Sequence, residues 1–537
     1  MTFTMHGNIS SPYLPVFGNK CIACKACTLD MHGVPRTPTW TVLNETALPN
    51  ATTITLSEAV DWVAGEEIAI AATSYNGREG EQRTILAINK TDPNYPVITL
   101  DQPLEFKHFA MIQWYGNDFI DMRAEVGLLT RNVKYQGSPY DSPADQYGAV
   151  FFLHSQGDDS LIARLDHIEL HNVGQAFKVG RYAVHFHMIG AVHKSYCKGL
   201  GTHTSFNRAF TIHGTHYLRL MNNVAYDVKG HTIFIEDAVE KKNYIYKNLI
   251  MKTKRSFSLL NTDTSPACFW ITNPDNNFVE NHCGGSDRYA YWYDLQKHAI
   301  GSHANTNVCP ENERVGTFRD NHAHSCGRYG LRIFHNMEPR KYPCKAVTYD
   351  PSNPTDPFWK NPAITAEFWN LTSWKNGRNG AIAERVGDVR FHNFKVADNL
   401  LAGIEFSLTD MHGDNTTRVD NALIIGATNN TDSKLRSATP YGFIGPRTEN
   451  FRIENSRFFN FNWKDASALS SCSHCFHGAS TDSGARTVRA RNLTFDSTVT
   501  LIFNFQYPWR SIFLDEDGSI TGKGAGSWAT PYFVHHN

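Results

Sequence analysis

A short internal repeat is the feature that most restricts how this chain folds. Residues 207–213 (NRAFTIH) align with residues 230–236 (GHTIFIE) at an offset of 23 residues, with β-branched and aromatic residues at matching places. A repeat of this length has room for two or three short strands, and it lacks helical periodicity. Propeller blades of about 40 residues would each need four antiparallel strands. The repeat therefore predicts an all-β fold, a right-handed parallel β-helix whose coils bury their apolar faces against one another.

Histidines and acidic residues of the same stretch form a candidate polar ladder. His185 and His187 are two residues apart and so share one face of an extended strand, while His213 and Glu236 fall one and two repeats further along. Parallel strands stack about 4.8 Å apart, so equivalent positions of successive coils lie in a row. This row, which ends at Glu236 and Asp237, has the donors to bind a metal, calcium or zinc, or to transfer protons. The alternative is a structural stack of hydrogen-bonded side chains.

Charge and hydropathy do not favour a nucleic-acid or membrane partner. The 51 basic and 52 acidic residues nearly cancel, so the charge balance gives no sign of binding to nucleic acid or anionic lipid. No run of 18 or more apolar residues is present, so we expect no membrane-spanning segment. The first ten residues also lack the basic and apolar regions of a secretory signal.

Two other features are compatible with an extracellular or cell-surface glycoprotein. The eleven cysteines suggest disulfides in an exported chain, with at least one cysteine left over because the number is odd. Glycosylation sequons of the Asn-x-Ser/Thr type are dense. They begin at Asn8, Asn44, Asn50, Asn89, Asn370, Asn415, Asn429 and Asn492.

Turn residues divide the chain into many short strands. Within residues 1–108, glycine or proline punctuates nearly every gap between candidate strands, which predicts a separate β-rich unit. Further along, asparagines recur at intervals of 23 to 49 residues. Asparagine tolerates left-handed turns, so we expect these residues at the corners of the coils, with loop insertions in the longer intervals. They are Asn223, Asn248, Asn281, Asn321, Asn370, Asn393, Asn421, Asn455 and Asn492.

The order of several motifs resembles the fibrocystin-L family. The motifs are LDMHGVPRTPTWTVL, DMRAEVGLLTRNV, GQAFKVGRYAVHFHM, FNRAFTIHGTHYL, FWITNPDNN and LDEDGSITG. The resemblance extends over nearly the whole chain and, less completely, to hyaluronan-degrading relatives. It implies the C-terminal part of an eight-glycine-type domain at 1–108, a pectin-lyase-like β-helix at 109–525 and a tail at 526–537. It also implies a longer parent protein, which is expected to be anchored to a membrane, with Met1 as an internal position of that parent.

The hyaluronan-degrading relatives imply a set of catalytic candidates. They use an arginine and two aspartates in the region that contains Arg131, Asp141 and Asp145 here, and His185 and His187 are further catalytic candidates. Glycoside hydrolysis needs two carboxyl groups at a defined separation, and an arginine binds a substrate carboxylate in a two-pronged manner. The structural alternatives are an ion pair at a coil corner for the arginine and turn positions for the aspartates.

The cysteines suggest local structure. Cys21, Cys24 and Cys27 depart from the family pattern, and with His32 they would make a zinc site, the alternative being a disulfide or free thiols. The resemblance implies that Cys309 pairs with Cys344.

Two further motifs lie near the end of the chain. Cys472 and Cys475 are candidates for a local disulfide. Residues 515–519 (DEDGS) are expected to form a closing turn between strands, with calcium binding as the alternative.

Two functions remain open from the sequence. The first is an extracellular β-helix ectodomain that acts as a rigid scaffold or as a recognition surface for a glycan or an extracellular protein. Aromatic residues 289–293 could stack on sugars, although alternate side chains are expected to face the core. The second is a hyaluronan-like polysaccharide depolymerase, which would use Arg131, Asp141 and Asp145 with the histidine ladder. The candidate metal ligands in that ladder are His185, His187, His213 and Glu236.

Overall fold

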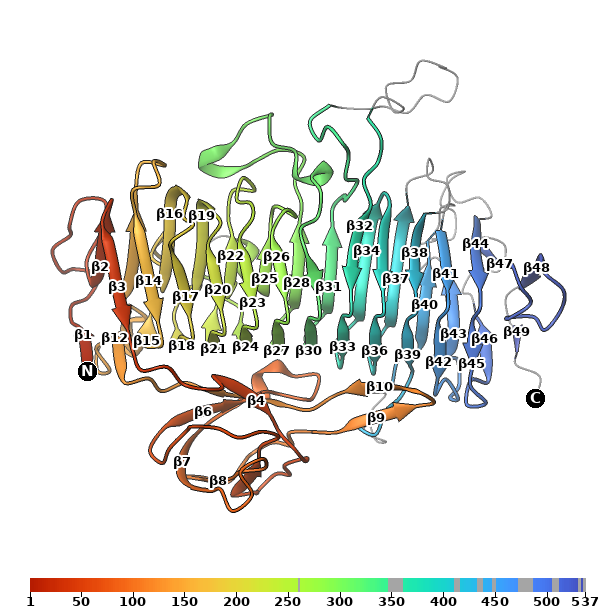
Figure 1. Cartoon of the computed structure of the whole chain (residues 1–537), viewed down its shortest axis with the longest axis horizontal. Coiled ribbons are helices and arrows are strands. Elements are labelled where there is room, and N and C mark those ends of the chain that lie inside the picture. Colours follow the sequence, from red (N-terminus) through yellow and green to blue (C-terminus); the bar gives the residue numbers. More distant parts are fainter. Residues whose placement is uncertain are drawn as a thin grey trace.

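The chain forms a long β-helix with a smaller antiparallel sheet beside it (Figure 1). The computed structural model describes residues 1–258, 261–345, 361–409, 416–431, 438–446, 451–471, 486–504, 511–529 and 533–534. Three sheets run along the helix axis, and successive coils contribute one strand to each. Pairing within the sheets is parallel from coil to coil, which confirms the predicted fold. Phe210 pairs with Ile233 and Ile212 with Ile235, as the 23-residue repeat requires.

Sheet 1 contains β1 (Thr2–Met5), β12 (Val133–Gly137), β15 (Ile168–Val173), β18 (Gly201–Ser205), β21 (Val224–Lys229), β24 (Leu249–Lys254), β27 (His282–Ser286), β30 (His322–Cys326), β33 (Thr372–Trp374), β36 (Lys395–Ala397), β39 (Leu423–Ile425), β42 (Arg457–Phe459) and β45 (Thr494–Phe495). Sheet 2 contains β2 (Cys21–Lys25), β13 (Val150–His154), β16 (Val184–Ala191), β19 (Phe210–His216), β22 (Ile233–Ile235), β25 (Ala267–Ile271), β28 (Tyr289–Asp294), β31 (Tyr329–Phe334), β34 (Asn379–Val386), β37 (Ala402–Thr409), β40 (Tyr441–Gly445), β43 (Ser467–Ser471), β46 (Leu501–Phe503) and β49 (Phe533–Val534).

Sheet 3 contains β3 (Thr28–His32), β14 (Ile162–Asp166), β17 (Tyr196–Lys198), β20 (Arg219–Met221), β23 (Tyr244–Tyr246), β26 (Asn277–Val279), β29 (Phe318–Arg319), β32 (Ala366–Trp369), β35 (Val389–His392), β38 (Thr417–Asp420), β41 (Phe451–Glu454), β44 (Arg486–Arg491), β47 (Ser511–Asp515) and β48 (Ser527–Ala529). The helical turns are short: η1 (Gly77–Glu79), α1 (Ser142–Asp145), η2 (Asn261–Thr264), η3 (Gly301–His303) and η4 (Pro310–Asn312). Within these described ranges, no helix has the length and apolarity needed to cross a bilayer.

The strand pairing moves the predicted domain boundaries. The separate antiparallel sheet consists of β4 (Trp40–Val42), β5 (Thr53–Thr55), β6 (Glu67–Ile70), β7 (Glu81–Asn89), β8 (Val97–Leu100) and β11 (Glu125–Leu128). A hairpin of β9 (Ile112–Tyr115) and β10 (Asp118–Asp121) accompanies it. The division at residue 108 fails because β1, β2 and β3 pair in parallel with β12, β13 and β14 and so form the first coil. The tail predicted at 526–537 likewise contains β48 and β49, which pair antiparallel with β47 and β46.

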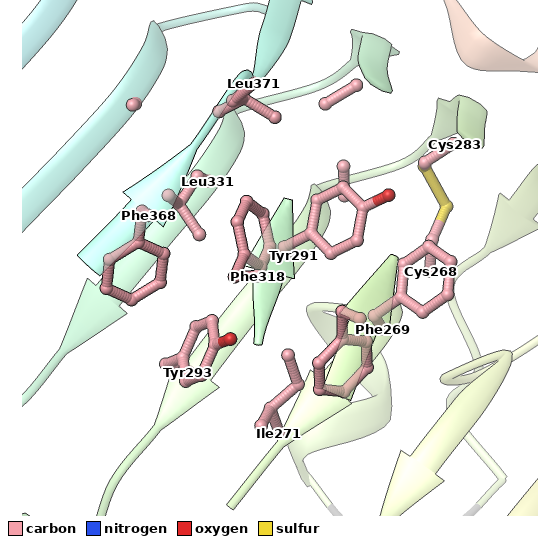
Figure 2. Packing of buried hydrophobic residues seen from close by; sticks show 14 of the residues in the cluster. Cys268, Phe269, Ile271, Cys283, Tyr291, Tyr293, Phe318, Leu331, Phe368 and Leu371 are labelled. Carbon is pink, nitrogen blue, oxygen red and sulfur yellow. A yellow bond between two sulfur atoms is a disulfide. The ribbon is translucent and has the colours of Figure 1, made fainter. Parts of the chain in front are cut away.

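The interior of the helix is a continuous apolar stack. Side chains of sheet 2 that point inward lie above one another from coil to coil, because parallel register repeats at each strand. Phe269 and Tyr291 stack with ring centroids 4.5 Å apart, and Tyr293 lies beside Phe318 and Phe368 (Figure 2). The prediction that alternate residues of 289–293 face the core is therefore confirmed for Tyr291 and Tyr293, both 0% exposed.

A buried ladder of asparagine amides joins several coils. The side-chain N–H of Asn223 donates to the side-chain oxygen Oδ1 of Asn248 at 2.9 Å. In the same way Asn248 donates to Oδ1 of Asn281 at 2.9 Å, and Asn281 donates to Oδ1 of Asn321 at 3.2 Å. The predicted left-handed corners hold for Asn370, Asn393, Asn421, Asn455 and Asn492 but not for these four. In their coils the left-handed position is one residue earlier, at Asn222, Lys247, Glu280 and Asp320.

The antiparallel sheet is fixed to the helix by buried polar contacts. Glu125 of β11, 1% exposed, has one carboxylate oxygen 2.6 Å from Nδ1 of His282 and the other 2.8 Å from Nε2 of His324. The indole N–H of Trp40 donates to the carbonyl of Lys247 at 2.9 Å. A Cβ atom at Gly284 would lie 2.7 Å from Cβ of Ala71, so the close approach of the two sheets requires glycine there.

Replacing Asn248 with alanine is expected to destabilise the helix strongly. The amide of Asn248 bonds to the backbone N–H and amide of Asn223, to the carbonyl of Leu220 and to Asn281. Alanine leaves these buried groups unpaired, so we expect a loss of at least about 2 kcal/mol in the free energy of unfolding. Chemical denaturation measures this loss. Asn393→Gly, at a half-buried left-handed position, is the control and should cost less than about 1 kcal/mol.

Candidate functional site

The outer face of sheet 2 brings the predicted histidine ladder together. His185 and His187 lie on β16 and share one face, as their spacing predicts. His187 pairs in register with His213 of β19, and Glu236 follows directly after β22 in the next coil. The parallel register that builds the core therefore also aligns these polar side chains on the outside of the wall.

His213 is the centre of this cluster. Its Nδ1 atom lies 3.1 Å from Nδ1 of His187 and 3.6 Å from a carboxylate oxygen of Glu236. Its Nε2 atom is 2.7 Å from Oδ2 of Asp237. The bond to Asp237 fixes the ring orientation and places the proton of the neutral ring on Nε2, so the Nδ1 lone pair faces His187 and Glu236.

His303 completes the cluster, and sequence reasoning did not identify it. Its Nδ1 atom lies 2.9 Å from Oδ2 of Asp237, and its backbone N–H donates to the same oxygen at 3.2 Å. The residue belongs to η3, within the long excursion between β28 and β29, and therefore has no place in the coil repeat. No periodic signal could have found it. The residues His185, His187, His213, Glu236, Asp237 and His303 are called the histidine cluster below.

Burial and neighbouring charges shift the pKa values of the histidines in the cluster in different directions. Burial holds the pKa of His185 well below its usual range and lowers the pKa of His187 to about 4, helped in both cases by neighbouring histidines. Burial also acts on His213, but the hydrogen bond to Asp237 and the charge of Glu236 outweigh it and raise its pKa. Burial raises the pKa of Glu236. His185 and His187 are therefore neutral at pH 7.

The donor geometry suits a small divalent cation. Two nitrogens bound to one zinc ion at 2.0–2.1 Å in a tetrahedral site lie roughly 3.4 Å apart, close to the 3.1 Å between the His187 and His213 nitrogens. His185 binds the carbonyl of Gly180 through Nδ1, while its buried Nε2 has no hydrogen-bond partner among the described residues. The same is true of one carboxylate oxygen of Glu236. Asp237 would act behind His213 as an orienting carboxylate.

The arginine and aspartates proposed from the resemblance do not form a comparable site. Arg131 is 3% exposed, and its guanidinium donates to the carbonyls of Leu128, Thr130 and Gly199 at 2.8 to 2.9 Å. Its guanidinium therefore stabilises the backbone of a coil corner. This position does not support a role in binding a substrate carboxylate. Asp141 and Asp145 are exposed at the two ends of α1. In the sequence they follow β12, whereas Arg131 precedes it.

The disulfides of the structure can be compared with most of the predictions made for the cysteines. Cys24 and Cys27 form a disulfide and Cys21 is free, so the predicted zinc site with His32 lacks its thiolates. His32 instead lies within 4.0 Å of carboxylate oxygens of Asp30 and Asp166.

Two further disulfides link the later coils. The pairing of Cys309 with Cys344 is confirmed, and Cys268 pairs with Cys283 in addition. Cys472 and Cys475 lie outside the described residues.

The predicted closing turn near the end of the chain is confirmed. Asp515 is 0% exposed, and its carboxylate accepts hydrogen bonds from the backbone N–H groups of Gly518, Ile520 and Thr521 and from the Thr521 hydroxyl. With four donors already bound, this carboxylate is committed to the turn between β47 and β48.

Two family descriptions match the chain. A G8 domain matches residues 1–44, and a CEMIP beta-helix matches residues 147–331, which contain the whole histidine cluster. Mouse Fibrocystin-L is 32% identical over 569 residues, and the match covers 97% of this chain and 13% of that protein. The chain is fibrocystin-L-like. It thus corresponds to only a small part of the length of these relatives.

Other relatives share parts of the fibrocystin-L-like chain. Human Cell surface hyaluronidase CEMIP2 is 31% identical over 395 residues, with 64% of this chain and 28% of that protein covered. Among solved structures, the catalytic unit of a GH87 alpha-1,3-glucanase from Streptomyces thermodiastaticus aligns with a TM-score of 0.35 and 10% identity, covering 86% of each chain.

A buried carboxyl beside the cluster should make the stability of the chain depend on pH. Glu240 is 0% exposed and accepts hydrogen bonds from the backbone N–H groups of Gly214 and Asp237 through one oxygen, while burial raises its pKa to about 7. The folded state holds the proton longer than the unfolded state, so stability falls as pH rises from about 4.5 to about 7, by roughly 3 kcal/mol. Denaturation midpoints between pH 4 and pH 8 measure this loss.

Glu240→Gln keeps the accepting oxygen and removes the ionisation. We expect the variant to lose this part of the pH dependence and to be more stable than the wild type at pH 8. An unchanged pH profile in the variant would contradict the assignment to Glu240.

Proposed function

We propose that this chain serves as a rigid, extracellular or cell-surface β-helix ectodomain that presents a recognition surface for a glycan or an extracellular protein. The observation that carries the proposal is the continuous pairing of three sheets from the first coil to the last, with the antiparallel sheet fixed to it by Glu125. Because each coil is hydrogen-bonded to both neighbours, the positions of surface side chains are held at regular intervals.

The location outside the cell rests on the disulfides and the relatives. Three disulfides are rare in reducing compartments. The name of the human relative, Cell surface hyaluronidase CEMIP2, places that protein at the cell surface. Both features support the same location for this chain.

Size-defined hyaluronan provides the test that separates a scaffold from an enzyme. The purified chain is incubated with it in the presence of calcium, zinc or EDTA, and polymer length is read by gel mobility beside a known hyaluronidase. We expect unchanged polymer length, because the guanidinium of Arg131 is buried and donates to backbone carbonyls, whereas Asp141 and Asp145 are exposed. Shortening that disappears in Asp145→Asn would overturn the proposal in favour of the two-carboxylate mechanism.

The second candidate function is metal-dependent cleavage of a polysaccharide at the histidine cluster. The observation that favours it is the group of nitrogen and carboxylate donors around His213, with Asp237 behind it. A metal held by His187, His213 and Glu236 would supply Lewis-acid chemistry for water or for an oxygen of the substrate, and the partly buried carboxyl of Glu236 would be placed to move a proton. Shortening of a polysaccharide that disappears in His187→Ala would assign cleavage to this site.

Metal binding at the histidine cluster is testable without any activity. Calorimetric titration with zinc, and separately with calcium, is expected to show one zinc ion per chain and at least about tenfold weaker binding in His187→Ala. His193→Ala replaces an exposed histidine outside the cluster and should bind zinc as the wild type does. Equal zinc affinity in both variants would mean that the cluster is a structural stack.

A further inference from the structure

A second polar site lies on the opposite side of the molecule from the excursions. A groove of about 480 Å³ runs between β10 and the corner where sheet 3 passes into sheet 1. The hairpin β9–β10 lies along the lower edge of the β-helix in Figure 1, away from the excursions at the top. The helix wall contributes residues of β30, β33, β36, β39 and β42 and of the corners before them. The lining residues used below are Asp118, Phe119, Asp320, Asn370, Asn393, Asn421, His322, Lys395 and Arg457.

The helix side of the groove carries an exposed row of amides. The side-chain amide of Asn421 donates to Oδ1 of Asn393 at 2.7 Å, and that of Asn393 donates to Oδ1 of Asn370 at 2.9 Å. The side-chain amide of Asn370 donates to a carboxylate oxygen of Asp320 at 2.6 Å. All four residues occupy left-handed corners of successive coils. The row therefore follows the helix axis with one polar group per coil, about 4.8 Å apart.

This amide row keeps unused hydrogen-bonding capacity. A primary amide has two N–H donors and two acceptor lone pairs on its oxygen. For Asn370 and Asn393 the row consumes one donor and one lone pair. Among the described residues, each therefore retains one donor and one acceptor outside the row, the combination that pairs with a hydroxyl group acting both as acceptor and as donor.

The charged groups of the groove are largely neutralised within the protein. Arg457 lies 2.7 Å from Asp118, and Asp320 lies 2.6 Å from Arg319. Burial holds the pKa of His322 well below its usual range, so its ring is neutral at pH 7. The groove therefore offers no excess of positive charge for a polyanion.

An aromatic pair forms the rim of the hairpin. Phe119 is 38% exposed, and the ammonium of Lys395 lies 4.0 Å from the centroid of its ring. Trp114, 66% exposed, lies beside it with ring centroids 5.1 Å apart. Exposed aromatic faces provide stacking surfaces for the apolar faces of sugar rings.

We propose that this groove binds a neutral polyhydroxylated glycan, with its hydroxyl groups on the row from Asp320 to Asn421 and its sugar rings against Phe119 and Trp114. The proposal rests on the recognition function proposed above and names the ligand class and the surface that carries it. A row with regular spacing matches a polymer whose hydroxyl groups also repeat, and the internal charge pairing selects against uronic-acid and sulfated chains.

Binding of defined glycans to the whole chain tests the proposal. Dextran, laminarin and yeast mannan oligosaccharides are titrated calorimetrically, with hyaluronan and heparin oligosaccharides as anionic comparators. We expect at least one neutral glycan to bind and both anionic ones to bind more weakly. Asn393→Gly keeps the left-handed backbone and removes the amide, so it should weaken binding about 3- to 10-fold. Phe119→Ser, on the hairpin and outside the helix core, should weaken it similarly.

Asn455→Gly is the matched control. Asn455 occupies an equivalent left-handed corner and donates to Asp420 but does not line the groove, so its replacement should leave binding unchanged. Binding that survives both Asn393→Gly and Phe119→Ser would place recognition elsewhere. Failure of every neutral glycan to bind would overturn the groove proposal while leaving the scaffold untouched, because the scaffold is tested by the hyaluronan assay.

Asn370 supplies a separate check because it starts the sequon Asn370-Leu371-Thr372. A glycan attached at Asn370 would replace one amide N–H of the row and cover the groove. Mass spectrometry of the chain secreted from animal cells is expected to find Asn370 without a glycan. Full occupancy of Asn370 would overturn the proposal, since the groove would then hold a sugar attached to the chain itself.

Discussion

Hydrogen bonding between neighbouring coils is the constraint on which the rest of this structure depends. A coil by itself has no neighbouring strand on either side with which to pair its backbone donors and acceptors, so no coil is stable alone. The buried amides of Asn223, Asn248, Asn281 and Asn321 extend the same pairing to side chains inside the corner. The wall that results is stiff enough to hold irregular excursions and a second sheet without losing its register.

That register also places two chemically different polar surfaces on one molecule. On sheet 2 it aligns partly buried imidazoles, whose removal from water favours neutral rings that act as ligands. At the corner between sheets 3 and 1 it aligns exposed amides, which stay neutral at every pH and offer both donors and acceptors. The first surface suits a cation or proton transfer, and the second suits hydroxyl groups.

Periodic features could be predicted from the sequence, and irregular ones could not. The 23-residue repeat correctly pairs Phe210 with Ile233, and the two-residue spacing of His185 and His187 correctly places them beside His213. His303 reaches the cluster from an excursion, where nothing in the sequence fixes its position. Arg131 shows a different limit, because a resemblance transfers a residue type but does not predict that the side chain is buried. The groove was missed because its hairpin wall lies hundreds of residues away from its amides.

The position of the antiparallel sheet has a consequence for the order in which the chain folds. The sheet is inserted between β3 and β12, so Thr2 pairs with a residue far along the chain, Lys134. Phe210, by contrast, pairs with Ile233, which is only one repeat away. Closing the longer segment costs about 1.5 kcal/mol more in chain entropy. Contacts that are close in sequence form sooner. The central coils therefore act as the nucleus, and β1, which pairs with β12, is among the last strands to join the β-helix.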